Sequence, residues 1–270
     1  MFSDKKEVRE KTVALLCKYY FRRNVTDFPN TRDMDAINMD LIEICNKEIN
    51  EGRKLTIEFI KNKVLTGKGK PSSLLELYTG LEDSLFYYNG GMARYALAKL
   101  DSISHSREYS PNLWERNAKG NFVWTVEHVF PQGKNIPKDW VEMIANGDKE
   151  LAEEYREEWV HCLGNLSLSG YNSKLSNHSF NRKQAKVNAT SLGRKIEIGY
   201  KNGLALNNLE FELDSSRYSL ANAPEWTIEY IEARNNEMVK QLVTLFAFEG
   251  EDVEATIKEA FKEEEIEAEA

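Results

Sequence analysis

The sequence predicts an α+β protein that is mostly helical and is built around one strand–strand–helix unit. Two short runs, 124–132 and 163–172, are rich in apolar and β-forming residues, and each ends in a residue that interrupts a strand. The segment 172–186 follows the second run and has the pattern of a capped helix with its apolar positions facing inward. Most of the remaining chain shows apolar residues at helical spacing.

Residues 1–120 are predicted to form an N-terminal helical region. Apolar residues recur there near the 3.6-residue period of an amphipathic helix, and turn-forming stretches separate the periodic segments. The expected helices cover 7–23, about 33–50, a segment that opens at Thr56, a segment capped by Ser72 and Ser73, and 92–100. Arg22 and Arg23 end the first helix, where they either touch DNA or take the more ordinary role of surface or capping residues.

The strand–strand–helix unit is predicted to span 121–205, with 133–160 inserted between its two strands. The insertion mixes aromatic and aliphatic residues with charged ones, so we expect one or two amphipathic helices there. A strand or loop followed by a long helix is expected in 206–248. The segment 249–270 contains ten acidic and two basic side chains and is predicted to be a helix-prone acidic tail that is frayed or disordered.

The composition predicts a cytoplasmic protein. The chain has 270 residues, of which 41% are hydrophobic, which is enough to bury a substantial core. No apolar run approaches the roughly 20 residues of a membrane span, and the charged N-terminus lacks the apolar core of a signal peptide. The three cysteines are odd in number and lack CxxC spacing, which favours a reducing compartment. We therefore expect no membrane partner.

The net charge of −8 is distributed unevenly along the chain. The acidic tail alone accounts for it, whereas 161–202 contains seven basic side chains and one acidic side chain. A phosphate backbone binds to such a basic patch, and the position of this patch within the strand–strand–helix unit favours DNA binding over a merely solvated helix face. The residues predicted to bind DNA are Lys174, Arg182, Lys183, Lys186, Arg194 and Lys195.

Four polar residues lie near the ends of the two strands. Glu127 and His128 come late in the first run, Asn165 lies in the second, and Asn172 opens the following helix. A neutral imidazole can take a proton from water, and an oxygen-ligated divalent ion can stabilise the charge of a phosphoryl group. The set therefore suits metal-assisted phosphodiester hydrolysis. Because side chains alternate along a strand, it requires a bend or a strand end at Glu127 and His128.

The sequence contains Glu127-His128-Val129-Phe130-Pro131-Gln132, then Leu163-Gly164-Asn165-Leu166-Ser167-Leu168, then Asn172 with Phe180 and Lys183. Together these motifs resemble the HNH-type (His-Me finger, ββα-metal) nuclease domain. The resemblance is strongest to the C-terminal nuclease domain of the GmrSD type IV restriction enzymes and to the related SspE phage-defence nuclease. It implies that the strand–strand–helix unit is one ββα-metal finger.

The resemblance also implies a role for each motif residue. His128 would be the general base that activates water, and Asn165 would orient its imidazole by hydrogen-bonding the other edge. Glu127 and Asn172 would hold one divalent ion, Mg²⁺ or Mn²⁺, with Asn177 as the alternative to Asn172. The chain would then be a metal-dependent DNA endonuclease that nicks or cuts DNA in the restriction of phage or modified foreign DNA.

The N-terminal helical region resembles the region that precedes the finger in GmrSD-like proteins. The sequence contains no Walker-type GxxxxGK[ST] and no strand-linked Asp-Gly-Gln-Arg-type motif. It therefore resembles the nuclease half alone, as a fragment or as a stand-alone short relative. Besides DNA, the resemblance implies a second partner, a nucleotide-hydrolysing sensor domain or subunit that is absent from this chain.

Other interpretations stay open at the level of sequence. A catalytically silent module that binds nucleic acid or protein in a defence system would carry the same motifs. Asn165 and Asn172 can cap a turn and a helix while also serving the site, and His178 can bind phosphate or be structural. A zinc site is a further alternative, although no pair of its candidate ligands has zinc-finger spacing. Those ligands are His128, His161, Cys162 and His178.

Overall fold

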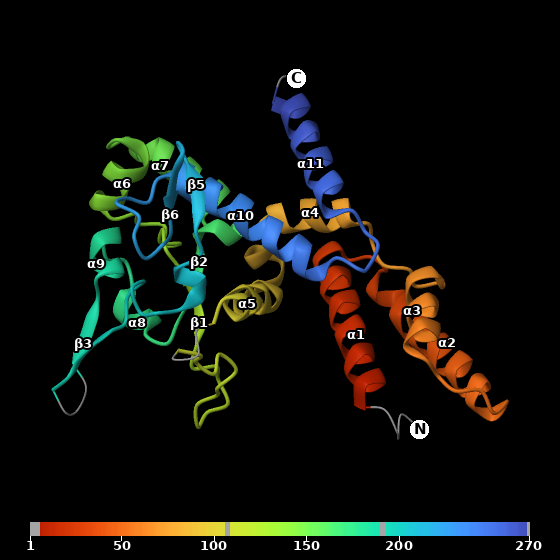
Figure 1. Ribbon diagram of the computed structural model, residues 1–270. Coiled ribbons are helices and arrows are strands. Elements are labelled where there is room, and N and C mark those ends of the chain that lie inside the picture. Colours follow the sequence, from red (N-terminus) through yellow and green to blue (C-terminus); the bar gives the residue numbers. More distant parts are fainter. Residues whose placement is uncertain (1–5, 106–108, 190–192, 269–270) are drawn as a thin grey trace. The chain divides into compact units, whose positions relative to one another are not determined.

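The computed structural model describes residues 6–105, 109–189 and 193–268. The chain is mostly helical with small two-stranded antiparallel sheets, in agreement with the mixed fold class that the sequence predicts (Figure 1). It divides into two compact units, Met1–Gly80 with Val243–Ala270, and Leu81–Leu242. None of the helices in the described part is long and apolar enough to cross a membrane.

The first unit is made of helices. They are α1 (Lys6–Thr26), α2 (Thr31–Asn50), α3 (Ile57–Thr66), α4 (Leu74–Glu82), which ends at the edge of the unit, and α11 (Val253–Ala268). Side-chain caps explain two of the helix starts: the Thr56 hydroxyl accepts from the N–H of Phe59, and Ser73 and Glu76 exchange hydrogen bonds as a capping box. One cluster of buried residues in this unit contains Tyr19, Met34, Ile60, Val64 and Phe248.

The acidic C-terminal segment is a helix over much of its length, whereas the sequence predicts a frayed or disordered tail. Asp252 caps α11 by accepting from the N–H of Ala255 at 3.0 Å. Ala260 is buried, and the Phe261 ring lies 6.3 Å from the Tyr78 ring, edge to face. Apolar side chains on one face of the helix therefore anchor a segment whose charge alone suggests disorder.

Arg22 lies inside the first unit, so it is not available for the DNA contact considered from the sequence. Its guanidinium is buried, pairs with Glu251 at 2.8 Å and lies over the Phe248 ring at 4.7 Å. Arg23 bonds to the Pro29 carbonyl and to Asp27 in the turn between α1 and α2. Both arginines thus stabilise the fold of this unit.

The second unit contains the strands and the predicted site. Its helices are α5 (Leu85–Ile103), α6 (Lys138–Ala145), α7 (Lys149–Trp159), α8 (Asn172–Leu175), α9 (Phe180–Gln184) and most of α10 (Ile228–Phe246), with 3-10 turns at Leu163–Asn165 and Ala205–Asn207. Its strands are β1 (Thr125–His128), β2 (Leu166–Ser169), β3 (Val187–Ala189), β4 (Lys195–Glu197), β5 (Phe211–Leu213) and β6 (Ser216–Tyr218). α6 and α7 lie in the inserted stretch between β1 and β2.

The sequence predicts a domain boundary near residue 120, but the second unit begins at Leu81. The difference arises from α5, which contacts β2 and both 3-10 turns and so belongs with the sheet rather than with the helices before it. Helical periodicity identifies α5 as a helix, but it cannot tell which core the helix joins.

β1 and β2 form the antiparallel pair on which the site is built. Thr125 lies opposite Ser169, and His128 lies opposite Leu166. β1 ends at His128, and the chain continues into Val129 and Phe130, which are both completely buried. The two other strand pairs are β3 with β4 and β5 with β6.

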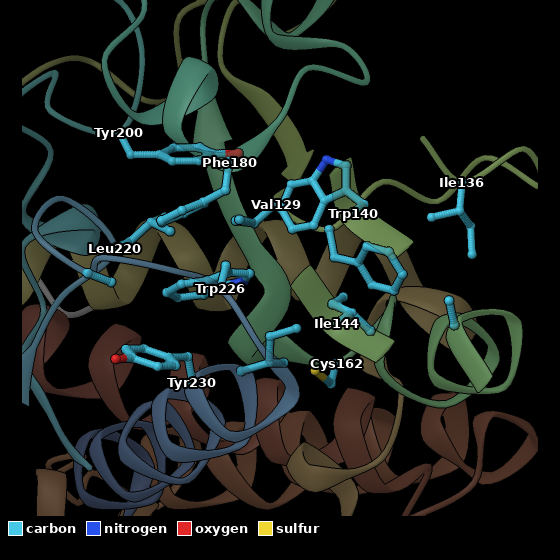
Figure 2. Packing of buried hydrophobic residues seen from close by; sticks show 14 of the residues in the cluster. Val129, Ile136, Trp140, Ile144, Cys162, Phe180, Tyr200, Leu220, Trp226 and Tyr230 are labelled. Atoms are coloured by element: carbon cyan, nitrogen blue, oxygen red, sulfur yellow. The ribbon is translucent and has the colours of Figure 1, made fainter. Parts of the chain in front are cut away.

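An aromatic core holds the helices of the second unit around the end of β1 (Figure 2). Phe180 stacks on Trp226 at 5.4 Å, and Trp140 lies beside Phe130 at 5.6 Å. Burying a large apolar side chain of this kind contributes about 1.5–3 kcal/mol. This core therefore ties α6, α9 and the loop before α10 to the segment that follows His128.

The segment 172–186 forms two short helices rather than the single helix that the sequence predicts. Ser176, with φ of 44°, interrupts the helical backbone between α8 and α9. Leu175 and Phe180 still face the core, with 1% and 0% of their surface exposed. The apolar pattern therefore indicates the buried face correctly, while the backbone turn at Ser176 has no strong sequence signal.

Candidate functional site

Asn165 fastens the chain immediately after His128. Its Oδ1 accepts from the N–H of Phe130 at 2.7 Å, and its Nδ2 donates to the carbonyls of Phe130 at 3.1 Å and Val160 at 3.0 Å. The side chain is completely buried, so these bonds compensate for its lost hydration. The resemblance implies a bond from Asn165 to the imidazole of His128, whereas these bonds of Asn165 reach backbone and position the imidazole indirectly.

The close approach of α10 explains why a glycine, Gly164, precedes Asn165. A Cβ at Gly164 would lie 2.1 Å from the Ile231 carbonyl oxygen on α10. The buried Arg234 of α10 donates to the carbonyls of Gly164 at 2.6 Å and Leu166 at 2.9 Å, and Asn235 accepts from the N–H of Gly164. α10 thus holds the turn that carries Asn165 in place.

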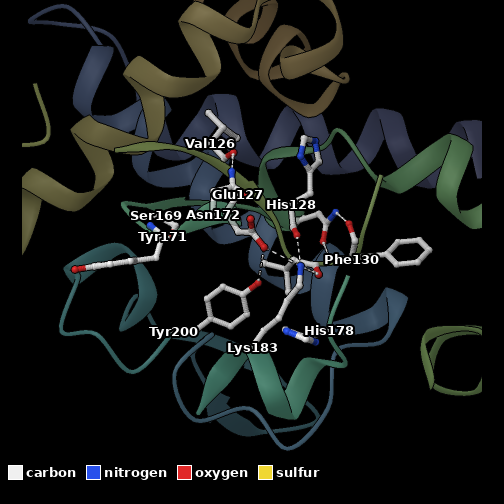
Figure 3. A network of polar contacts seen from close by, with 12 residues as sticks. Val126, Glu127, His128, Phe130, Ser169, Tyr171, Asn172, His178, Lys183 and Tyr200 are labelled. Carbon is white, nitrogen blue, oxygen red and sulfur yellow. Dashed lines mark hydrogen bonds and ion pairs between the residues drawn. The ribbon is translucent and has the colours of Figure 1, made fainter. Parts of the chain in front are cut away.

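Glu127 forms a buried ion pair with Lys183 of α9. The Lys183 ammonium donates to Oε1 of Glu127 at 2.7 Å and to the carbonyls of His128 at 2.8 Å and Val129 at 3.0 Å (Figure 3). Tyr200 donates to the same carboxylate oxygen at 3.4 Å. All three N–H groups of the ammonium are thus hydrogen-bonded, and only the charged form of lysine has three.

Burial opposes charge at both ends of this pair. It raises the pKa of Glu127 against the effect of the Lys183 charge, and it lowers the pKa of Lys183 against the effect of Glu127. We describe the pair as ionised because each of the three Lys183 hydrogen bonds has an acceptor of good geometry. Burial also raises the pKa of Tyr200, so its hydroxyl stays protonated and donates.

The imidazole of His128 points to the other face of β1, away from Lys183 (Figure 3). Its Nε2 lies 3.1 Å from Nδ1 of His161, and its ring meets the Phe86 ring edge to face at 4.7 Å. Burial, then the neighbouring His161 and Lys183, lower the pKa of His128 to about 3. His128 is therefore neutral at neutral pH, with a nitrogen lone pair, although only 7% of the residue is exposed.

Glu127 and His128 consequently do not converge in this structure. Strand alternation holds through the end of β1, and the chain does not bend until after both residues. The two side chains contact different neighbours, Lys183 and Tyr200 for Glu127, and Phe86 and His161 for His128. The bend required to bring them to one point is absent at His128.

Asn172 is bonded to β1 next to Glu127, whereas Asn177 is exposed beyond α8. Asn172 begins α8, and its Nδ2 donates to the Val126 carbonyl at 2.6 Å, so the side chain joins α8 to β1 rather than capping the helix. Asn177 is exposed after α8, with its amide nitrogen near Gly133. Of the two candidate ligands, Asn172 is thus the one attached to the strand that carries Glu127.

The oxygen donors here suit a magnesium ion by type. Within the described residues, no hydrogen bond reaches Oε2 of Glu127 or Oδ1 of Asn172. Mg²⁺ is commonly bound by one or two protein oxygens, with waters and substrate phosphate completing its shell.

Residues in the described ranges form no cluster of three His, Cys, Asp or Glu side chains. The Cys162 thiol donates to the Trp159 carbonyl and burial raises its pKa to about 12, so the zinc alternative is not supported.

The prediction that Lys183 binds DNA is wrong, because Lys183 is buried in its ion pair with Glu127 and has a structural role. Lys174 donates to Asn188 of β3 at 2.7 Å and lies over the Tyr171 ring. Arg182, Arg194 and Lys195 are exposed, and Lys186 is half-buried. Burial, then the charges of Arg182, Lys186 and Lys183, lower the pKa of His178, which indicates positive potential around α9.

Several residues of this site carry no sequence signal. Tyr200 and Arg234 lie far along the chain from their partners and match no motif. From the sequence, His161 is only a possible zinc ligand, and no pattern singles out Phe86. Its position two residues before the Leu163-Gly164-Asn165 motif is the one sequence feature that would have drawn attention to His161.

The sequence model of the family described as GmrSD restriction endonucleases, C-terminal domain, matches residues 75–241. The chain belongs to this family. The GmrSD C-terminal match nearly coincides with the compact unit Leu81–Leu242 and includes the two strands, Asn165 and Asn172. Membership in the GmrSD family implies nuclease activity and a DNA substrate class. No curated protein and no solved structure matches the chain.

Proposed function

We propose that this GmrSD-family chain is a metal-dependent DNA endonuclease of the HNH type, with His128 as the general base. The observation that supports this most is the place of His128 at the end of β1, directly before a backbone segment that Asn165 holds by hydrogen bonds to Phe130. β1, β2 and α8 follow one another in the strand–strand–helix order of a ββα-metal finger. A general base contributes about 10²–10⁴-fold to a rate when it is fixed within reach of the proton.

In this proposal the protein's own residues hold and move one proton. His128 accepts a proton from water as the water oxygen attacks phosphorus and the bond to the leaving oxygen breaks. Asn165 keeps the backbone of Phe130 in place, so the imidazole is preorganised rather than free to rotate away. Because His128 is only 7% exposed, substrate entry requires a local movement of the side chains above it.

Glu127 and Asn172 would hold one Mg²⁺ or Mn²⁺ through Oε2 and Oδ1. Because Glu127 and His128 point to opposite faces of β1 (Figure 3), the ion and the base would meet at one phosphate only after a movement at the end of β1. The bound ion would then neutralise charge on the scissile phosphate and on the leaving oxygen. Lys183 occupies the other carboxylate oxygen and favours the ionised form of Glu127, which a cation requires. Asn177, which is exposed and lies near Gly133, is the weaker candidate for the second ligand.

DNA phosphates would be bound by basic residues on and after α8. Arg182, Lys186, Lys195, Arg194 and Lys174 are the candidates, and Lys183 is excluded by its burial. We propose that the activity serves the restriction of phage or modified foreign DNA in the cytoplasm. A nucleotide-hydrolysing sensor domain or subunit would select the DNA to be cut.

A catalytically silent DNA-binding module is the second candidate, since the Glu127 carboxylate is paired with Lys183 and His128 is nearly buried. Plasmid cleavage separates the two. Supercoiled plasmid is incubated with the purified chain in Mg²⁺, in Mn²⁺ and in a chelator. Nicked or linear product with either ion and none with the chelator supports the nuclease. DNA binding without product under all three conditions favours the silent module.

A further inference from the structure

We propose that His161 is a positioning residue for His128, which fixes the tautomer of the catalytic imidazole and so makes Nδ1 of His128 the proton-accepting atom. This inference rests on the proposed function, because it assigns a role within the same site. The two histidines are 33 positions apart in the sequence, but their facing nitrogens, Nε2 of His128 and Nδ1 of His161, lie 3.1 Å apart.

Three rings fix the orientation of this pair. The Phe86 ring of α5 stacks on the His161 ring at 5.4 Å and an interplanar angle of 23°, and it meets the His128 ring edge to face at 4.7 Å. The two imidazoles themselves are inclined at 76° to each other. Phe86 therefore restricts the planes of both imidazole rings, and within those planes Nε2 of His128 faces Nδ1 of His161.

Asn165 connects the two histidines through the backbone. Its Nδ2 donates both to the Phe130 carbonyl, two residues after His128, and to the Val160 carbonyl, one residue before His161. One buried amide group thus fixes the chain segments that carry the two imidazoles. This common anchor distinguishes a built pair from two side chains that happen to meet.

The contact between Nε2 of His128 and Nδ1 of His161 restricts which tautomer of His128 can act as a base. A neutral imidazole has one N–H and one lone pair, so one histidine must donate and the other accept. If His161 donates from Nδ1, then His128 uses its only lone pair at Nε2 and cannot take a proton from water. If His128 donates from Nε2, its Nδ1 keeps a lone pair, and no hydrogen bond among the described residues reaches that atom.

The second arrangement also balances the proton transfer. Water gives its proton to Nδ1 of His128, and the resulting imidazolium still donates its Nε2–H to Nδ1 of His161. Burial and the charge of Arg156 on α7 lower the pKa of His161, so that its Nδ1 remains an acceptor at neutral pH. His161 therefore stabilises the charge that appears on His128 by accepting its Nε2–H.

Two variants separate hydrogen bonding from packing. His161→Phe keeps a ring on Phe86 but has no acceptor, whereas His161→Asn loses the ring but places an amide oxygen near the position of Nδ1. We expect His161→Phe to lower kcat for plasmid cleavage roughly 10- to 100-fold with little change in KM, and His161→Asn to restore most of it. Equal loss in both variants, or full kcat in His161→Phe, would overturn the proposal.

A readout independent of cleavage separates this proposal from the proposed function. Long-range ¹H–¹⁵N spectra of the full chain report the tautomer of each histidine, whether or not the protein cuts DNA. We expect His128 to be entirely the Nε2–H tautomer in the wild type and in His161→Asn, and a mixture in His161→Phe. An Nδ1–H tautomer of His128 in the wild type would contradict the assignment even if cleavage were observed.

Discussion

The ammonium of Lys183 lies 2.7 Å from Oε1 of Glu127, and 1% and 3% of the two side chains are exposed. The same ammonium donates to the carbonyls of the two residues that follow Glu127. Lys183 therefore fixes the backbone of His128 and Val129 at the end of β1. Asn165 fixes the backbone of the next residue, Phe130. The conformation of the chain at His128 depends on these two buried polar side chains.

Lys183→Met should strongly destabilise the protein. It leaves the Glu127 carboxylate buried without its counter-ion, which typically costs about 3–5 kcal/mol. The double variant Glu127→Gln/Lys183→Met removes the uncompensated charge and should recover a large part of that loss. Urea unfolding followed by tryptophan fluorescence gives the free energies. A change below about 1 kcal/mol in the single variant would show that the pair is not charged and buried as described.

Asn165→Ala should lower both stability and activity. It leaves the N–H and carbonyl of Phe130 and the carbonyl of Val160 without their partner, for a loss of roughly 2–5 kcal/mol. Asn172→Ala is the matched control, because it removes an asparagine that bonds mainly to the Val126 carbonyl and should cost only about 1 kcal/mol. Thermal denaturation compares the two. Similar losses would contradict the anchoring role of Asn165.

Arg182→Gln/Lys186→Gln should weaken DNA binding and flatten its dependence on salt. Each phosphate contact contributes about 0.9 to the slope of log K against log salt, so the double variant should lose up to roughly 1.8 of that slope. The control is Lys138→Gln/Lys149→Gln, which removes the same charge from exposed positions on α6 and α7. Fluorescence anisotropy across a salt series measures both, and an equal change in slope would remove α9 from the DNA interface.

Cys162 should resist alkylation in the folded protein, while Cys17 reacts. Burial raises the pKa of the Cys162 thiol to about 12, so the reactive thiolate is scarce at pH 8. At higher pH, Cys162 should become reactive only when the fold opens. Cys17 is exposed on α1. Iodoacetamide labelling followed by mass spectrometry gives the rate at each site. Labelling of native Cys162 at the rate of Cys17 would mean that the segment beside His161 is open.

The sequence identifies the two strands because their apolar runs and breakers are local signals. It also contains the alternation rule that sends Glu127 and His128 to opposite faces, and the structure follows that rule rather than the bend that the proposed chemistry requires. By contrast, the Glu127–Lys183 pair joins residues 56 positions apart, and nothing local distinguishes Lys183 from its exposed neighbour Arg182. Burial of a charge is decided by tertiary packing, which a charge count cannot register.

The same limit applies to the His128–His161 contact and to α11. His161 comes next to His128 only because α6 and α7 return the chain to the end of β1. The acidic composition of 249–270 predicts disorder, yet apolar residues such as Ala260 and Phe261 give α11 a packed face. Such long-range contacts become predictable only once the topology is known.

The most direct measurement is single-turnover cleavage of plasmid DNA in Mg²⁺ by the wild type, His128→Ala and His128→Gln. Glutamine keeps much of the side-chain volume beside Phe86, so at least one variant should retain the wild-type melting temperature. We predict that both folded variants lose at least about 100-fold in cleavage rate, because neither supplies a proton acceptor in place of the imidazole. A folded His128 variant that cleaves at the wild-type rate would contradict the assignment of His128 as the general base.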